Sequence, residues 1–195
     1  MQHDHSNPAR RNFLRNTLIA SAAALPLSQL ASAQTADSSD TTLPESMRSL
    51  KSVAAQVVPI GNEERIARVA KAQRLMAEHG IDAVFIGAGS SLTYFTGMRW
   101  WDSERLTGVI LPRKGEPVYV TPEFERVRTL EQIKLGNDVR GWQEDEDPYA
   151  LVAKVLRDMG HATGTLGMEE AVPYFRAKGI ADALPQAKVV PAWPV

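Results

Sequence analysis

The chain has 195 residues, a formal net charge of −1 at pH 7 and no cysteine. The near-neutral charge gives no reason to expect binding to nucleic acid or to an acidic membrane surface. The lack of thiols excludes disulfides, thiolate zinc sites and a cysteine nucleophile. Beyond the N-terminal segment, no apolar run approaches the roughly 18 residues that a membrane helix needs, so we expect no membrane span in the mature chain.

The first 33 residues have the features of a twin-arginine secretion signal. Arg10 and Arg11 precede a Phe-Leu step, an alanine- and leucine-rich stretch runs from Thr17 to Leu30, and Ala31-Ser32-Ala33 offers the small residues that a signal peptidase recognises. We therefore predict cleavage after Ala33 and export, to the periplasm or out of the cell, by the twin-arginine pathway. The alternative is an amphipathic N-terminus that is not processed.

Residues 34–59 are rich in Ser, Thr, Asp and Ala and show little apolar periodicity. Such a composition predicts a flexible arm or linker rather than part of a packed core.

The domain predicted for residues 60–195 begins with a helix. Asn62 is placed to cap that helix, apolar residues follow at helical spacing, and Gly80 supplies a left-handed stop. The apolar run Ile81–Ile86 then predicts a buried strand. After Gly87-Ala88-Gly89, we expect Ser90 to cap a short helix that runs through Phe95.

The second half of the domain alternates in the same way. Asp147-Pro148 predicts a helix start, with proline at the first helical position. The expected elements are strands at 106–111 and 117–121 joined by a hairpin turn, a helix from Pro122 to about Leu135, a strand at 139–142, a helix from 148 to Gly160, a strand at 165–168, a helix at 173–184 and a strand at 187–190. This order predicts a three-layer α/β/α domain with a mixed, mostly parallel sheet.

The segment Gly87–Ser91 lies between a predicted strand and a predicted helix, where glycine-rich loops bind phosphate. Leu92 stands where a dinucleotide fingerprint needs its third glycine, and no Gly-Lys-Ser/Thr follows, so a structural turn is favoured. Ser90 or Ser91 as a nucleophile would need a base. The mature chain offers His79 and His161, both at helix ends, and a hydrolase triad is therefore disfavoured.

The acidic run Glu144-Asp145-Glu146-Asp147 lacks the alternating ligands and the glycine of a calcium loop. A solvated acidic loop that ends in a helix cap is the favoured interpretation.

The segment 94–105 is unusual because it contains adjacent tryptophans, Trp100 and Trp101. Neighbouring side chains of an extended chain point in opposite directions, so one tryptophan is expected to be exposed. Exposed tryptophan beside arginine is typical of binding surfaces. Packing of both aromatics on the domain's own edge is the equally weighted alternative.

Several short motifs follow one another through this half of the chain: Tyr94-Phe95-Thr96-Gly97, Ser103-Glu104-Arg105, Val109–Pro112, Gly115-Glu116 and Pro122–Glu125. In combination they resemble the N-terminal domain of the creatinase, prolidase and aminopeptidase P family. The likeness runs from about Asn62 to Val190. It implies a creatinase N-terminal-like, ribonuclease H-like α/β fold.

The resemblance also implies a functional context. Members of the family join this domain to a C-terminal "pita-bread" domain, in which two aspartates, a histidine and two glutamates hold two divalent ions, usually manganese, cobalt or zinc. That second domain cleaves bonds next to proline, or hydrolyses creatine. The N-terminal domain dimerises and closes one side of an active site. By this likeness, Tyr94, Trp100, Trp101 and Arg105 are expected to be substrate-side or interface residues.

No metal-ligand set stands in the sequence, which stops at Val195, where the linker to a catalytic domain is expected. We therefore expect no catalytic residue, no metal and no peptidase activity in this chain alone. The predicted function is that of the non-catalytic N-terminal domain of an exported Xaa-Pro metallopeptidase, whose parent is a homodimer acting on proline-containing peptides. The alternative is a stand-alone periplasmic binding or interaction module.

Overall fold

The computed structural model describes residues 44–48 and 50–195, so the predicted secretion signal lies outside the described residues. The chain divides into two units, Met1–Val57 and Val58–Val195. In the first unit the described residues form α2 (Glu45–Arg48) and a 3-10 turn at Ala54–Gln56. All of these described residues are exposed.

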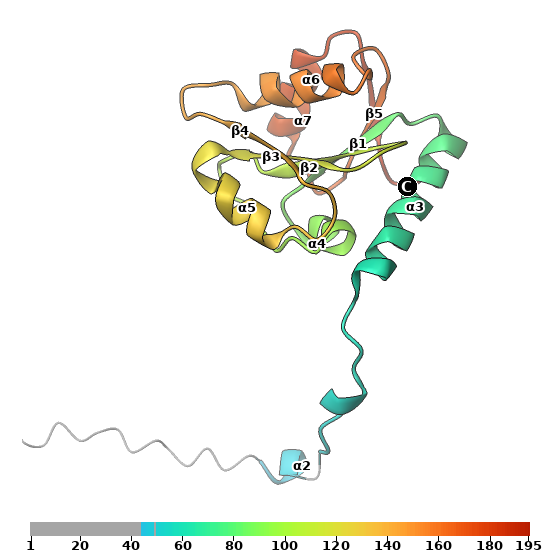
Figure 1. Cartoon of the computed structure of the whole chain (residues 1–195), viewed down its shortest axis with the longest axis vertical. Helices are drawn as coiled ribbons and strands as arrows, with labels where there is room; N and C mark the ends of the chain where they lie inside the picture. The colour runs from blue at the N-terminus through green and yellow to red at the C-terminus, as the bar shows by residue number, and fades with distance from the viewer. Residues whose placement is uncertain (1–43, 49) are drawn as a thin grey trace, which may run out of the picture. The chain divides into compact units, whose positions relative to one another are not determined.

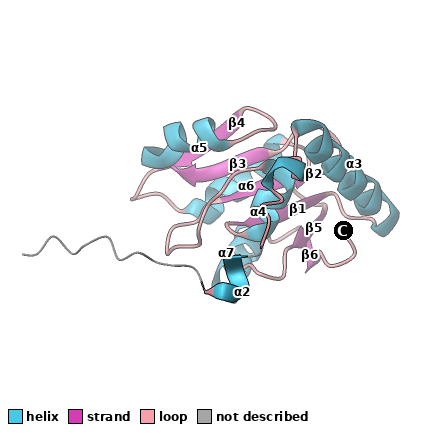
Figure 2. Cartoon of the chain, turned by 90° about the horizontal axis from the view of Figure 1, so that it is seen from below, coloured by secondary structure: helices cyan, strands magenta, loops and turns pink. Residues whose placement is uncertain are grey.

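The second unit is built on one six-stranded sheet. Its strands are β1 (Ala83–Gly87), β2 (Gly108–Pro112), β3 (Val118–Pro122), β4 (Asp138–Trp142), β5 (Thr165–Met168) and β6 (Lys188–Pro191). Figure 2 shows them side by side in the order β4-β3-β2-β1-β5-β6. Strand β2 is antiparallel to both of its neighbours, and the other neighbouring pairs are parallel. The predicted mixed, mostly parallel sheet is confirmed.

Helices cover both faces of this sheet (Figure 1). On one side lie α6 (Pro148–Asp158) and α7 (Tyr174–Ala183), and on the other lie α3 (Asn62–His79), α4 (Ser90–Thr96) and α5 (Arg126–Gln132). The strands supply both cores because successive side chains point to opposite faces. In β1, Phe85 packs into the cluster under α6 and α7, whereas Val84 and Ile86 pack into the cluster with Met76 of α3.

Most helix ends follow the local sequence signals. Gly80 adopts the left-handed conformation with φ 67° and donates its N–H to the carbonyl of Met76. The Asp147 carboxylate accepts from the N–H of Tyr149 at 2.8 Å, as expected of a cap. The two other predicted caps are wrong by one residue. Helices α3 and α4 begin at Asn62 and Ser90 themselves, and the preceding glycines, Gly61 and Gly89, take the cap positions.

The prediction of a helix from Pro122 to about Leu135 is wrong at both ends. Pro122 is the last residue of β3, where it is paired with Trp142 of β4. A 3-10 turn at Glu123–Glu125 follows, and α5 ends at Gln132. The helix stops early because Ile133 is extended and Lys134 donates its N–H to the carbonyl of Thr96, 3.2 Å away. A tertiary contact thus replaces the last helical turn.

The direction of the strands brings the candidate segments to one edge. Strands β1, β3, β4, β5 and β6 run the same way, so their carboxyl ends share an edge of the sheet. Strand β2 runs against them, and the segment that precedes it therefore lies at that edge too. The glycine-rich turn, the tryptophan segment, the acidic run and the start of α7 all leave this carboxyl edge. Crevices at such edges are where ligands bind in open α/β sheets.

Candidate functional site

The tryptophan loop, defined here as Arg99–Arg105, leaves the core at a firmly held point. Helix α4 ends at Gly97, whose φ of 77° suits glycine and whose N–H donates to the carbonyl of Thr93 at 3.0 Å. A Cβ at this position would lie 2.7 Å from Nε of Arg65. The next residue, Met98, is fully buried in the core cluster on the α3 side. The loop therefore starts from a fixed base.

The two adjacent tryptophans lie in different environments. Trp100 is partly buried against the core cluster, and the guanidinium of Arg128 from α5 lies 4.6 Å from its ring centroid. Trp101 is 90% exposed. The expectation of one exposed tryptophan is confirmed.

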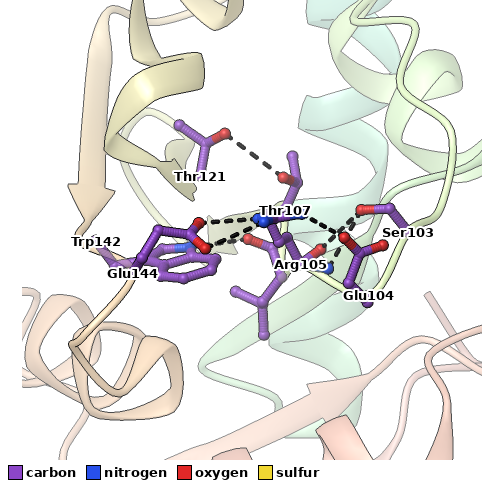
Figure 3. A network of polar contacts seen from close by, with 8 residues as sticks. Ser103, Glu104, Arg105, Thr107, Thr121, Trp142 and Glu144 are labelled. Atoms are coloured by element: carbon purple, nitrogen blue, oxygen red, sulfur yellow. Dashed lines mark hydrogen bonds and ion pairs between the residues drawn. The ribbon is translucent and has the colours of Figure 1, made fainter. Parts of the chain in front are cut away.

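Arg105 is engaged with acidic neighbours (Figure 3). Its Nε and Nη2 donate to the two carboxylate oxygens of Glu144 at 2.8 and 3.1 Å, and its Nη1 pairs with Glu104. The bond from Arg105 lowers the pKa of the Glu144 carboxyl below its ordinary value. Because the Arg105 guanidinium already donates to both oxygens of Glu144, it can bind an external carboxylate only if these bonds break first.

A buried polar ladder lies under Arg105 and fixes the end of the loop. The indole of Trp142 donates to the carbonyl of Leu106 at 3.0 Å, and the hydroxyls of Thr107 and Thr121 lie 3.5 Å apart. Thr121 also accepts from the hydroxyl of Thr129 in α5. These contacts join the start of β2 to β3, to β4 and to α5.

Tyr94 belongs to a different part of the surface. The guanidinium of Arg68 in α3 lies 4.0 Å from the centroid of its ring, and Arg68 Nη1 donates to its carbonyl at 2.9 Å. Within the described part of the chain, no hydrogen bond, ion pair or ring contact joins Tyr94, Trp100, Trp101 and Arg105 to one another. The four predicted residues therefore have separate partners: Arg68 for Tyr94, Arg128 for Trp100 and Glu144 for Arg105, whereas Trp101 is exposed.

The glycine-rich turn is closed by a carboxylate from elsewhere in the fold. Glu169, directly after β5, accepts from the hydroxyl of Ser91 at 2.8 Å and from the N–H of Gly87 at 3.4 Å. The hydroxyl of Ser91 and the N–H of Gly87 are thus bonded within the fold. A cavity of about 160 Å³ adjoins this turn, lined by Ser91, Glu169 and the aromatic rings of Phe95 and Trp193, among others. It is smaller than the roughly 300 Å³ at which ligand pockets begin.

The acidic run is divided among separate tasks, which agrees with the solvated-loop interpretation. Glu144 holds Arg105, Glu146 accepts from the N–H of Gln143 at 2.7 Å, and Asp147 caps α6. In residues 44–48 and 50–195, no group of three or more His, Cys, Asp or Glu side chains is arranged to hold a metal ion. These residues therefore do not fit a two-metal centre.

Arg176 also lies at this edge, although no sequence motif pointed to it. It lies in α7, is 3% exposed, and bonds to Asp102 and to the carbonyl of Ser103 in the tryptophan loop. A signal was present, because Arg176 shares the buried stripe of α7 and its end with Ile180 and Leu184 at four-residue spacing. An arginine on such a stripe needs a partner.

Over the part of the chain that the structure describes, no helix has the length and apolar character to cross a bilayer.

Comparison with known proteins gives a consistent set of likenesses. Residues 68–195 match the Creatinase/Prolidase N-terminal domain family. The probable dipeptidase PepE of Mycobacterium tuberculosis is 35% identical over 120 residues, which make up 60% of this chain and 31% of that protein. The crystal structure of dipeptidase PepE from Mycobacterium ulcerans has a TM-score of 0.59 at 30% identity, over 68% of this chain and 36% of that one.

A likeness of fold alone extends to an isolated domain. The Creatinase/Prolidase N-terminal domain of an X-Pro dipeptidase from Streptococcus pyogenes has a TM-score of 0.56 at 18% identity, over 66% of this chain and 95% of that one. The chain spans about a third of the length of the mycobacterial relatives that it matches.

Proposed function

The chain belongs to the creatinase/prolidase N-terminal domain family, and we propose that it serves as the non-catalytic N-terminal domain of an exported Xaa-Pro metallopeptidase. The observation that carries the proposal is the family match, together with the 35% identity to a probable dipeptidase over 31% of that protein's length. In this proposal the metal pair, its ligands and the hydrolysis of proline-containing peptides belong to a second, catalytic domain.

The part proposed for this domain is dimerisation and closure of the active site. The surface that would do this is the carboxyl edge, where Trp101 is 90% exposed and Trp100 is held under Arg128. A large aromatic side chain that is exposed on a fixed base loses little conformational entropy when a partner covers it. Tyr94, Trp100, Trp101 and Arg105 would contact either the substrate or the neighbouring subunit.

The first test is activity. The purified chain, supplied with Mn²⁺, Co²⁺ or Zn²⁺, is expected to leave an Xaa-Pro dipeptide intact in an assay that follows proline release. Measurement of bound metal after dialysis is expected to give less than one ion per chain. Stoichiometric binding of two ions with peptide turnover would show that the chain is an enzyme in its own right and would overturn the proposal.

The second test is self-association. Sedimentation equilibrium is expected to detect a dimer of the purified chain, and Trp101→Ala is expected to weaken it by about tenfold or more, as truncation of a central aromatic does. Trp193→Ala is the matched control, because Trp193 is also highly exposed, at 75%, but lies outside the tryptophan loop. A chain that stays monomeric at all concentrations would contradict the proposed dimerisation, and equal effects of both variants would contradict the role of the tryptophan loop in it.

The export route has its own test. Replacement of Arg10 and Arg11 by lysine is expected to keep the full-length precursor inside the cell, because the twin-arginine pair is the recognised feature of the signal. Cell fractionation followed by N-terminal sequencing checks both the location and the predicted cleavage after Ala33. An exported chain from the double variant would count against this route.

A further inference from the structure

Arg176 carries a charge in a place where a charge is costly. Its side chain is 4% exposed, and it stands one helical turn before Ile180, which is fully buried. Burying a guanidinium without partners costs far more than burying an apolar side chain of similar length, so its contacts must offset that cost. Its partners therefore show what the arginine holds in place.

Both partners of Arg176 lie in the middle of the tryptophan loop. Nη1 donates to Oδ1 of Asp102, and Nη2 donates to the carbonyl oxygen of Ser103. The third nitrogen, Nε, is buried and has no hydrogen-bond partner among the described residues. Among the described residues, the hydrogen bonds of this buried guanidinium therefore go to two adjacent loop residues, Asp102 and Ser103, which lie more than seventy positions earlier in the chain.

The loop has few other attachments at this point. Its start is held by the N–H of Arg99, which donates to Oε1 of Gln132 at 3.2 Å, and its end is held by Arg105 and Glu144. Between these points the residues form no helix or strand. Trp100 packs against the core cluster with Arg128 over its ring, whereas Trp101 is too exposed to be held by packing. The Arg176 contacts fall next to Trp101.

We propose that Arg176 is a positioning residue for Trp101. It fastens the middle of the tryptophan loop to the first turn of α7, so that the neighbouring, exposed Trp101 is presented in one place. The guanidinium of Arg176 lies 5.3 Å from the centroid of the Phe175 ring, which ties that aromatic to the same junction. Arg176 thereby joins two segments that are far apart in the sequence. The use of the exposed Trp101 in assembly rests on the proposed function, whereas the positioning does not.

Nuclear magnetic resonance of the purified chain, labelled with ¹⁵N-tryptophan, tests the proposal directly. The chain has four tryptophans, and Trp101→Phe assigns the signals of interest. In the unaltered chain the Trp101 amide is expected to have an order parameter of about 0.85, the value of a rigid backbone. In Arg176→Met, which keeps the apolar length but removes both bonds, it is expected to fall below about 0.6, the range of flexible loops.

Three comparisons separate positioning from a general loss of structure. Trp142 is an internal reference, because its indole is buried and donates to the carbonyl of Leu106 at 3.0 Å, and its signals should not change. Arg176→Lys keeps the charge but not the two-pronged geometry, so an intermediate order parameter is expected. Lys178→Met alters an exposed cation of the same helix, paired with Asp182, and should leave Trp101 rigid.

Asp102→Ala removes the carboxylate partner of Arg176. The Asp102 side chain is 50% exposed, so its loss leaves no cavity in the core. This variant removes one of the two bonds of Arg176 and leaves the bond to the Ser103 carbonyl, so an order parameter between those of the unaltered chain and Arg176→Met is expected for the Trp101 amide. It decides the matter if Arg176→Met does not fold. A Trp101 amide that stays rigid in Asp102→Ala, with Trp142 unchanged, would overturn the proposal. That result would leave the dimerisation and peptidase assays unaffected, so the failure of one proposal is distinguishable from the failure of the other.

Discussion

The glycine-rich turn follows β1 and the tryptophan loop precedes β2, the antiparallel neighbour of β1, and each segment bonds to a charged side chain from the far half of the sequence. In the turn, Glu169 accepts from Gly87 and Ser91, so the polar groups face one another and are satisfied. In the loop, Arg176 donates to Asp102 and to the carbonyl of Ser103, while Trp101 is exposed. The turn shows the stronger resemblance to a ligand-binding motif, and its Ser91 hydroxyl is bonded to Glu169. The loop matches no ligand motif and presents the larger unpartnered group.

This difference shows where recognition is to be expected at the carboxyl edge. A buried or half-buried polar group is satisfied within the fold because leaving it unpaired is costly. An exposed aromatic carries a smaller penalty and can persist until a partner covers it. In these two segments the large exposed side chain that a partner could cover is the indole of Trp101.

The largest expected effect comes from removing the support that the two segments share. Met98 is fully buried directly before the tryptophan loop, and its cluster also contains Leu92 of α4, which follows the turn. Met98→Ala should lower the free energy of unfolding by about 2–5 kcal/mol, measured by urea titration. Trp101→Ala is the control and should change it by less than about 0.5 kcal/mol, because it removes an exposed side chain. Equal losses would mean that Trp101 is part of the core.

A smaller effect distinguishes the two segments. Glu169→Ala removes both bonds of the turn and should cost about 1–2 kcal/mol, since the carboxylate is half-buried and its bonds are charge-assisted. The amide order parameter of Trp101 should not change, because Glu169 makes no bond to the tryptophan loop. Glu170→Ala changes a neighbouring exposed carboxylate and serves as the control. Loosening of Trp101 in Glu169→Ala would show that the two segments are one structural unit.

Much of the fold was predictable because its signals are local. Gly80 and Asp147-Pro148 mark helix ends through their own backbone preferences, and the apolar runs mark the inner strands through burial on both faces. The end of α5 was not predictable, because it depends on the contact between Lys134 and Thr96, which are far apart in the sequence.

In the candidate site, too, local features were predictable from the sequence and tertiary contacts were not. That one of Trp100 and Trp101 is exposed follows from the alternation of side chains, and that Asp147 serves as a cap follows from its position before a proline. The partners of the charged residues do not follow from local rules. Arg176 is conspicuous on the apolar stripe of α7, but nothing near it in the sequence points to Asp102. Likewise, nothing in the sequence near Glu169 indicates that its carboxylate accepts from the hydroxyl of Ser91.

The smallest expected effect concerns Arg105 and Glu144, at the exposed end of the tryptophan loop. The pKa of Glu144 is lowered in the folded chain by the hydrogen bond from Arg105, so the unfolded chain takes up this proton at a higher pH. The contribution of the pair to stability is therefore present above the ordinary glutamate value of 4.5 and is lost as the pH falls from there through the lower folded value. Urea midpoints measured across this range should decline less steeply in Glu144→Gln than in the unaltered chain. Glu131→Gln, an exposed carboxylate of α5, should retain the original slope, and high salt should reduce the difference because the pair is exposed. If Glu144→Gln keeps the full slope, the pair contributes nothing to fixing this end, and Arg176 is left as the main polar attachment of the loop.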